Sequence, residues 1–329
     1  MSIFRLCFSV ASLLAIPGIR IAVADPNASV VHLKPVSDAL NVVPVMVNGA
    51  GPFEFVLDTG SSSTTIDSEL AAQLRLAPTG SATLVTPRKS SLLPTVHADS
   101  LQVATEIVRG LDLSVERLGW LKAVYPKAQG ILGEDFLRNF DFLLDNRHHC
   151  LKLEQGPGSL VQELTGEHVL LTSHASNQAE SFQNRLILTV KVPELGPREL
   201  TVLLDSAASA LMLFPSAYPE LPGPHSESGR EVMFGGGDRH QVDEHHVTAL
   251  LVESTVLRNV AVVSTEASQV TDSDGLLPTG IFQSIYISHS GGFAIFNPVR
   301  CRRTRTSPGS RAVMRDRTEN VSEAAHSLP

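Results

Sequence analysis

The sequence has few cysteines and no spacing typical of metal ligands. Of three cysteines in 329 residues, only Cys150 and Cys301 lie beyond the N-terminal apolar segment. Two pairs of adjacent histidines, His148-His149 and His245-His246, lack the spacing of zinc ligands, so we expect them on exposed turns and predict no metal site. For the cysteines two alternatives stay open, a single disulfide between Cys150 and Cys301 or two buried thiols.

Basic residues are also in the minority. The chain has 26 Lys and Arg against 34 Asp and Glu, a formal net charge of -8. Six of the arginines fall in the last 28 residues, so the rest of the chain is more acidic than the total indicates. This balance argues against nucleic acid as a partner. The basic segment 302–329 is polar and without periodicity, which predicts a disordered tail.

Long hydrophobic runs are absent except near the N-terminus. There Arg5 precedes an apolar stretch, Leu6 to Ile16, and Ala22-Val23-Ala24 follows. This order is typical of a secretory signal peptide over residues 1–24, and the run is short for a bilayer span, although an uncleaved anchor stays open as the alternative. We therefore expect an exported protein, periplasmic or extracellular, without stable membrane insertion after cleavage.

A repeated motif occurs in the two halves of the sequence. Phe55-Val56-Leu57 leads into Asp58-Thr59-Gly60, and Val202-Leu203-Leu204 leads into Asp205-Ser206-Ala207, 147 positions later. A second matching pair follows each aspartate, Gly130-Ile131-Leu132-Gly133 after 72 residues and Gly275-Leu276-Leu277-Pro278 after 70. Such self-similarity predicts a duplicated domain.

Short apolar segments separated by Pro and Gly turns predict a mostly-β fold. One helix is expected after Asp67, which can cap it, and shorter ones near Gly133 and Thr279. Hairpins are expected over residues 79–97 and 232–242. Gly235, Gly236 and Gly237 would form the bend of the second hairpin, either as a mobile flap over a cleft or as a plain hairpin tip.

The residues around the first aspartate resemble those of aspartic proteases, specifically the bacterial retropepsin-like kind with two related lobes in one polypeptide. The resemblance rests on Asp58-Thr59-Gly60, on Gly130 to Leu137 and on Phe140 to Asp145. It implies a mostly-β acid protease fold of two related β-barrel-like lobes with a cleft between them. The implied domains are an N-terminal lobe over 25–154, a connection over 155–184 and a C-terminal lobe over 185–301.

The resemblance also implies a function, the hydrolysis of peptide bonds at acidic pH by an Asp58/Asp205 dyad that activates water without any cofactor. We expect a monomer acting on a peptide or protein substrate. The hydroxyls of Thr59 and Ser206 would bond to the opposite loop, and Gly60 and Ser61 would donate to Asp58. The segment Ile131-Leu132-Gly133 would buttress the first loop. Two alternatives stay open, a catalytically silent protein that binds peptides and a structural β protein.

The second half departs from the family pattern at two positions. Ala207 stands where the first loop has Gly60, and Pro278 stands where the first half has Gly133. Alanine adds a methyl group and resists positive φ, and proline removes an amide donor. Two outcomes are open, a distorted second loop that impairs activity or a second half whose other residues have adapted.

Overall fold

The structure is a computed structural model that describes residues 28–37, 39–87, 89–172, 185–214, 226–265 and 272–300. The predicted signal peptide, the basic tail and Cys301 lie outside these ranges. The described chain is mostly β, as predicted. In the described ranges, no helix is long and apolar enough to cross a membrane. The helical segments are all short: α1 (Ser68–Gln73), α2 (Gly119–Val124), α3 (Glu134–Leu137), α4 (Ser159–Glu163), η2 (Pro193–Leu195), η4 (Gly235–Gly237) and η5 (Thr279–Ile281).

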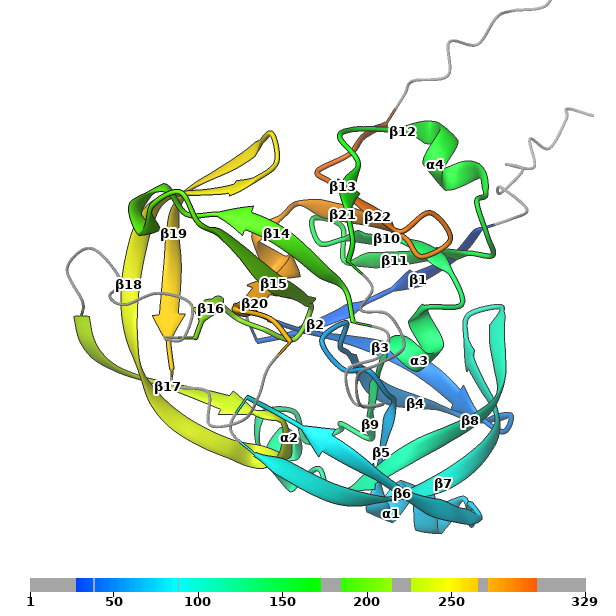
Figure 1. The fold of residues 1–329 in the computed structure, drawn as a ribbon. Coiled ribbons are helices and arrows are strands. Elements are labelled where there is room, and N and C mark those ends of the chain that lie inside the picture. The colour runs from blue at the N-terminus through cyan, green and yellow to red at the C-terminus, as the bar shows by residue number, and fades with distance from the viewer. Residues whose placement is uncertain are drawn as a thin grey trace, which may run out of the picture.

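A large sheet is built from the first half of the chain (Figure 1). Its buried face follows the alternation of side chains, as in β3, where Val43, Val45 and Val47 are fully buried and the intervening Pro44 is exposed. Pairing between β3 and β7 folds the sheet back on itself. In spatial order its strands are β2 (Lys34–Val36), β3 (Leu40–Val47), β4 (Ala50–Leu57), β9 (Gly130–Leu132), β5 (Thr65–Asp67), β8 (Glu106–Glu116), β7 (Ser90–Val103) and β6 (Pro78–Val85).

The second half of the chain forms a sheet with the same strand order from β3 onward, closed by the matching contact between β14 and β18. The two sheets also share the sense of pairing: β4–β9 and β15–β20 are both parallel, as are β5–β8 and β16–β19. The repeat seen in the sequence is therefore a repeat in three dimensions. The strands, in spatial order, are β14 (Ile187–Lys191), β15 (Glu199–Asp205), β20 (Gly275–Pro278), β16 (Leu211–Leu213), β19 (Thr255–Ser264), β18 (Asp238–Val252) and β17 (Ser226–Phe234).

A third sheet contains strands from both halves and lies at the upper right of Figure 1. The halves join where β10 pairs with β21, for example Phe142 with Ile287. A separate two-stranded ribbon is formed by β12 (Leu164–Thr165) and β23 (Val299–Arg300). The six strands of the third sheet are, in order, β1 (Ala28–His32), β11 (Cys150–Glu154), β10 (Asp141–Asp145), β21 (Ser284–Ser288), β22 (Phe293–Phe296) and β13 (Val169–Leu170).

The short elements follow the local signals in the sequence. Asp67 caps α1 by accepting a hydrogen bond from the amide of Glu69, as its position predicts. The short helical segments expected near Gly133 and Thr279 are α3 and η5. Both predicted hairpins are present, as β6–β7 and β17–β18.

One prediction about the histidines is confirmed and the other is wrong. His148 and His149 lie on the exposed turn between β10 and β11. His245 and His246, by contrast, lie inside strand β18, and His245 is buried. The reason is that β18 continues well past the end of the predicted hairpin, to Val252, so that this pair is part of a long ladder with β19.

Candidate active site

Two loops that each begin with an aspartate meet between the two halves of the chain. Asp58 follows β4 directly, and Asp205 is the last residue of β15. Each delivering strand is held by a parallel neighbour, β9 or β20, and the amide of Asp58 donates to the carbonyl of Leu132 at 3.0 Å. Buried ladders on both sides therefore fix where the two carboxylates emerge.

Four hydrogen bonds join the loops across an approximate two-fold axis. Thr59 Oγ1 donates to the carbonyl of Leu204 at 2.9 Å and accepts from the amide of Ser206 at 3.0 Å. Ser206 Oγ makes the equivalent pair, donating to the carbonyl of Leu57 at 2.9 Å and accepting from the amide of Thr59 at 3.0 Å. Both side chains are buried, so water does not compete for these bonds. The loops are thus held in a fixed relative position.

This interlock brings the two carboxyl groups against the same glycine. The amide of Gly60 donates to Asp58 Oδ1 at 2.9 Å. A Cβ added to Gly60 would lie 2.7 Å from Cγ and 2.9 Å from Oδ2 of Asp205. Gly60 is therefore required for lack of space, and its position shows that the Asp205 carboxyl packs onto the Asp58 loop.

The second carboxyl is held by its own loop in a similar way. The amides of Ala207 and Ala208 both donate to Asp205 Oδ1, at 2.7 and 2.9 Å. In the first loop the Ser61 hydroxyl differs from the expectation, because it donates to the carbonyl of Ser63 at 2.8 Å rather than to Asp58.

The carboxyl groups of Asp58 and Asp205 share protons because both are buried close to each other. Burial, and then the neighbouring Asp205 charge, raise the pKa of Asp58 to about 8. Burial also raises the pKa of Asp205, against the lowering effects of its loop amides and of Arg185. Two carboxyl groups this close titrate as a unit, so the first proton to bind remains bound over a wide pH range.

The segment predicted to buttress the first loop does contact it. Ile131 pairs with Val56 along β4, and a Cβ on Gly133 would lie 2.6 Å from the carbonyl group of Ser63. The amide of Gly133 donates to Thr64 Oγ1 at 3.1 Å. Thr64 in turn bonds to Asp135 through both its amide and its hydroxyl, at 2.9 and 2.6 Å. Asp135 belongs to α3, so this network fastens the helix to the loop.

The equivalent positions in the second half carry Leu211, Pro278 and Gly280. Proline lacks the amide that Gly133 uses, but leucine also lacks the hydroxyl that would accept from it, and glycine lacks the carboxylate. The Gly133 amide and the Thr64 hydroxyl that accepts from it are therefore lost together in the second half. Pro278 has φ -68° and ψ 131°, an ordinary proline conformation.

Ala207 fits its loop for a similar reason. Neither Ala207 nor Gly60 is among the described residues with positive φ, so the loop does not need glycine for its backbone angles. The concern that alanine would be strained at this position is thus removed. The second loop keeps two hydrogen bonds to its aspartate without that strain.

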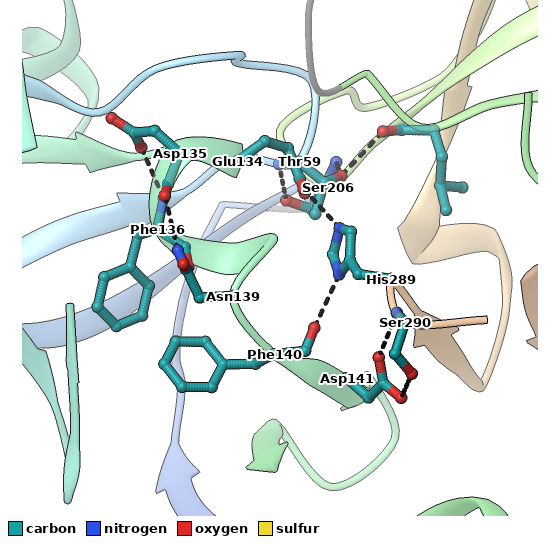
Figure 2. Close-up of polar contacts among 11 residues, drawn as sticks. Thr59, Glu134, Asp135, Phe136, Asn139, Phe140, Asp141, Ser206, His289 and Ser290 are labelled. Carbon is teal, nitrogen blue, oxygen red and sulfur yellow. Dashed lines mark hydrogen bonds and ion pairs between the residues drawn. The ribbon is translucent and has the colours of Figure 1, made fainter. Parts of the chain in front are cut away.

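A buried pair of His289 and Glu134, which the sequence did not reveal, lies behind the loops (Figure 2). His289 Nε2 lies 2.8 Å from Oε2 of Glu134, and Nδ1 lies 2.8 Å from the carbonyl of Phe140. Glu134 is fully buried, and its amide donates to the carbonyl of Ser61 in the first Asp loop. Burial alone lowers the pKa of His289, but the hydrogen bond and charge of Glu134 outweigh it, so the pKa is raised.

Glu134 responds to the same environment. Burial raises its pKa, and the hydrogen bond from His289 lowers it only in part. The two residues lie 155 positions apart and show no motif, so no local signal in the sequence could have paired them. The pair links the third sheet to the first Asp loop.

A cavity of about 520 Å³ opens over the two aspartates. Both loops line it, and so do parts of both predicted hairpins, from Thr83 to Pro87 and from Glu231 to Gly235. The remaining wall is largely apolar, contributed by each half: Leu40, Val56, Leu121, Val124, Ile131, Leu203, Met212, Phe214, Val263 and Leu276. This shape and lining are typical of a cleft that receives an apolar or extended ligand.

The two hairpin tips touch each other at the mouth of the cavity. Lys89 Nζ, beside the β6–β7 turn, donates to the carbonyl of Gly236 at 3.0 Å. Gly236 and Gly237 have φ of 75° and 74°, which favours glycine, and a Cβ on Gly237 would lie 2.8 Å from Cβ of Trp120 in α2. In Figure 1 the β17–β18 hairpin runs from the second half toward α2. The predicted flap glycines thus lie where the halves meet, while Gly235 lines the cavity itself.

Two further predictions from the sequence concern a metal site and the cysteines. Among the described residues no group of three or more His, Cys, Asp and Glu side chains could hold a metal ion. Cys150 is buried at the start of β11. Because Cys301 lies outside the described ranges, its pairing with Cys150 stays a prediction.

Comparison with protein families gives a match. A family model described as aspartyl protease matches residues 43–136, which contain the first Asp loop, the β6–β7 hairpin and the segment from Gly130 to Phe136. No curated protein matches the chain. The match does not reach Asp205, whose placement rests on the repeated topology and the interlock described above. Residues 43–136 therefore confirm the resemblance of this protein to the retropepsin-like aspartyl proteases.

Proposed function

We propose that this protein is an aspartic-type endopeptidase that cleaves peptide bonds with water activated by Asp58 and Asp205. The observation that carries the proposal is the interlock of the two loops, which sets both carboxyl groups against Gly60 at the floor of a large cavity. A family match to an aspartyl protease segment supports the same chemistry. Neither a metal nor a covalent intermediate is needed for it.

The reaction uses the singly protonated pair. The ionised carboxylate takes a proton from a water held between the two groups, and the water oxygen attacks the scissile carbonyl carbon. The protonated carboxyl group donates its hydrogen bond to the oxygen that becomes negative. As the tetrahedral intermediate collapses, a proton passes to the leaving nitrogen and the carbon–nitrogen bond breaks. The pair then returns to its starting protonation state.

The proposed architecture is the two-lobed acid protease fold, with one lobe for each repeated sheet, in a monomer exported from the cell. The substrate is an extended peptide or protein segment, which can hydrogen-bond to the backbone of the hairpins while its side chains enter the apolar walls. Hairpin tips that touch across the cavity must separate to admit a chain, so the contact between Lys89 and Gly236 has to break and re-form in each cycle.

The active pH range follows from the protonation of the pair. Activity requires one proton on the dyad, and the pKa of about 8 for Asp58 means that this proton is retained through neutral pH. The basic limb of the pH profile is therefore expected near pH 8, so the active range extends beyond the acidic conditions that the sequence resemblance implies.

Cleavage of an unfolded protein between pH 3 and 9 tests the proposal. Wild type should cleave it, a transition-state mimic such as pepstatin should inhibit, and Asp58→Asn and Asp205→Asn should each abolish turnover. Asp99→Asn serves as the matched control, because this side chain is 81% exposed and outside the cavity lining. If wild type and both active-loop variants are equally inert, the proposal fails, and peptide binding by these inert proteins would identify the catalytically silent alternative.

A further inference from the structure

One cation beside the aspartates has no role in the reaction as proposed above. Arg185 lies two residues before the start of β14, and its side chain lines the same cavity as Asp58 and Asp205. It is largely buried, 15% exposed, and its Nη1 lies 3.4 Å from Oδ1 of Asp272, which is 2% exposed. A buried guanidinium is costly to desolvate, so its position in the wall of the cavity needs a physical reason.

Strand register places Arg185 next to one particular aspartate. In the β14–β15 ladder Ile187 pairs with Leu203, and beyond it the amide of Leu204 donates to the carbonyl of Leu186 at 2.8 Å. Continuing the antiparallel register by one more residue sets Arg185 opposite Asp205. Residues two apart lie on the same face of a strand, so Arg185 shares a face with Ile187, and Asp205 shares a face with Leu203. Because Ile187 and Leu203 are paired, Arg185 and Asp205 lie on the same face of the sheet.

The first half of the chain has no cation at the corresponding position. Val42 pairs with Val56 in the β3–β4 ladder, and continuing that register by two residues sets Leu40 opposite Asp58. Leu40 also lines the cavity. The repeat therefore presents a leucine to one aspartate and an arginine to the other.

The charges that face each carboxyl group differ accordingly. Asp205 faces the carboxyl of Asp58 and the guanidinium of Arg185; burial raises the pKa of Asp205, and the charge of Arg185 opposes that rise. Asp58 faces Asp205 and, from α3, Glu134, both of which raise its pKa. Arg185 itself faces Asp272, then Asp205, then Asp58 in order of strength. Since guanidinium is always charged in proteins, the bias persists across the whole pH range.

We infer that Arg185 makes the two aspartates inequivalent, keeping Asp205 as the carboxylate and leaving the shared proton on Asp58. This inference rests on the proposed function for its consequence: Asp205 is the base that takes the proton from water, and Asp58 hydrogen-bonds to the developing oxyanion. Arg185 is a positioning residue, because it acts through Asp205 and not on the substrate.

Titration of the carboxyl groups tests this without any need for turnover. In the full chain labelled with ¹³C-carboxyl aspartate, NMR signals are followed from pH 3 to 9 and assigned with Asp58→Asn and Asp205→Asn. In wild type the signal of Asp58 should report the last proton to leave, and Asp205 should stay ionised well below that pH. If Asp205 holds the last proton in wild type, the inference is overturned, whatever the variants do.

Two variants test the role of the cation, one that removes it and one that keeps its charge. Arg185→Leu/Asp272→Leu copies Leu40 and leaves no buried charge without its partner, whereas Arg185→Lys keeps the charge. The double variant should shift the protonation of Asp205, and the acid limb of the kcat/KM profile, upward by about one pH unit; Arg185→Lys should stay close to wild type. Unshifted titration in a folded double variant refutes the role of Arg185. Absence of cleavage by wild type refutes the proposed function instead, and the NMR titration still decides on Arg185.

Discussion

Replacing Thr59 with valine tests the interlock between the two Asp loops most directly. Valine has nearly the same shape as threonine, so the packing is retained and the hydroxyl alone is lost. That hydroxyl donates to the carbonyl of Leu204 and accepts from the amide of Ser206, in a fully buried position. Both backbone groups would be left buried without a partner.

The magnitude follows from these two groups. An unsatisfied buried donor or acceptor costs about 1 to 3 kcal/mol, so Thr59→Val should lower the free energy of unfolding by about 2 to 6 kcal/mol. Ser206→Ala removes the mirror-image pair of bonds, to the carbonyl of Leu57 and from the amide of Thr59, and should cost a similar amount. Both variants should also lose turnover, because the distance between the carboxyl groups is no longer fixed.

Urea unfolding followed by circular dichroism measures the effect. Thr165→Val is the matched control, because the Thr165 hydroxyl donates to the carbonyl of Val299 at 3.1 Å in an exposed position, where water can replace it. That control should cost no more than about 0.5 kcal/mol. If Thr59→Val is as mild as Thr165→Val, the interlock does not hold the loops and the reasoning from the site geometry is wrong.

Three further outcomes are expected. Gly60→Ala should abolish turnover because its Cβ would lie 2.7 Å from Cγ of Asp205, whereas Ala207→Gly should keep at least a tenth of wild-type activity. His289→Gln should lower stability by about 3 kcal/mol, as measured by urea unfolding at pH 5, because it leaves buried Glu134 without its charged partner. The pKa of His289 is raised in the folded wild type, so the contribution of this pair to the free energy of unfolding should be full below pH 6.5 and lost as the pH rises through the pKa of folded His289. The difference in stability between wild type and His289→Gln should therefore be larger at pH 5 than at pH 8. Equal differences at the two pH values would contradict this prediction.

The repeat in the sequence was enough to predict that the two halves have corresponding elements, and the short apolar segments between turn signals predicted the mostly-β class. Apolar triplets before Asp58 and Asp205, and glycine-rich segments about 70 residues later, became the parallel pairs β4–β9 and β15–β20. Such patterns are readable because buried strands need apolar residues and tight contacts need glycine. The interlocking residues Thr59 and Ser206 were expected from the resemblance to aspartic proteases.

Contacts between side chains that are far apart in the sequence could not be predicted from it. Nothing near His289 indicates a bond to Glu134, because the third sheet, which contains strands from both halves, brings the two residues together. Arg185 was overlooked for a different reason: it is two residues before the first strand residue that pairs, and its relation to Asp205 appears only when the register is known. Long-range register is set by the whole sheet, so local patterns do not reveal it.

Differences between the halves are better explained as adaptation than as decay. Random loss would remove a donor and leave its acceptor buried, at a cost of about 1 to 3 kcal/mol for each orphaned group. In the second half Pro278, Leu211 and Gly280 replace Gly133, Thr64 and Asp135 as a set, so the amide of Gly133 and the hydroxyl that accepts from it are lost together. The second half also has Arg185 at the position opposite Asp205, whereas the first half has Leu40 at the position opposite Asp58. A pair of identical subunits could not differ in this way, but a duplicated chain can give each aspartate its own surroundings, and a reaction that needs one base and one acid benefits from that difference.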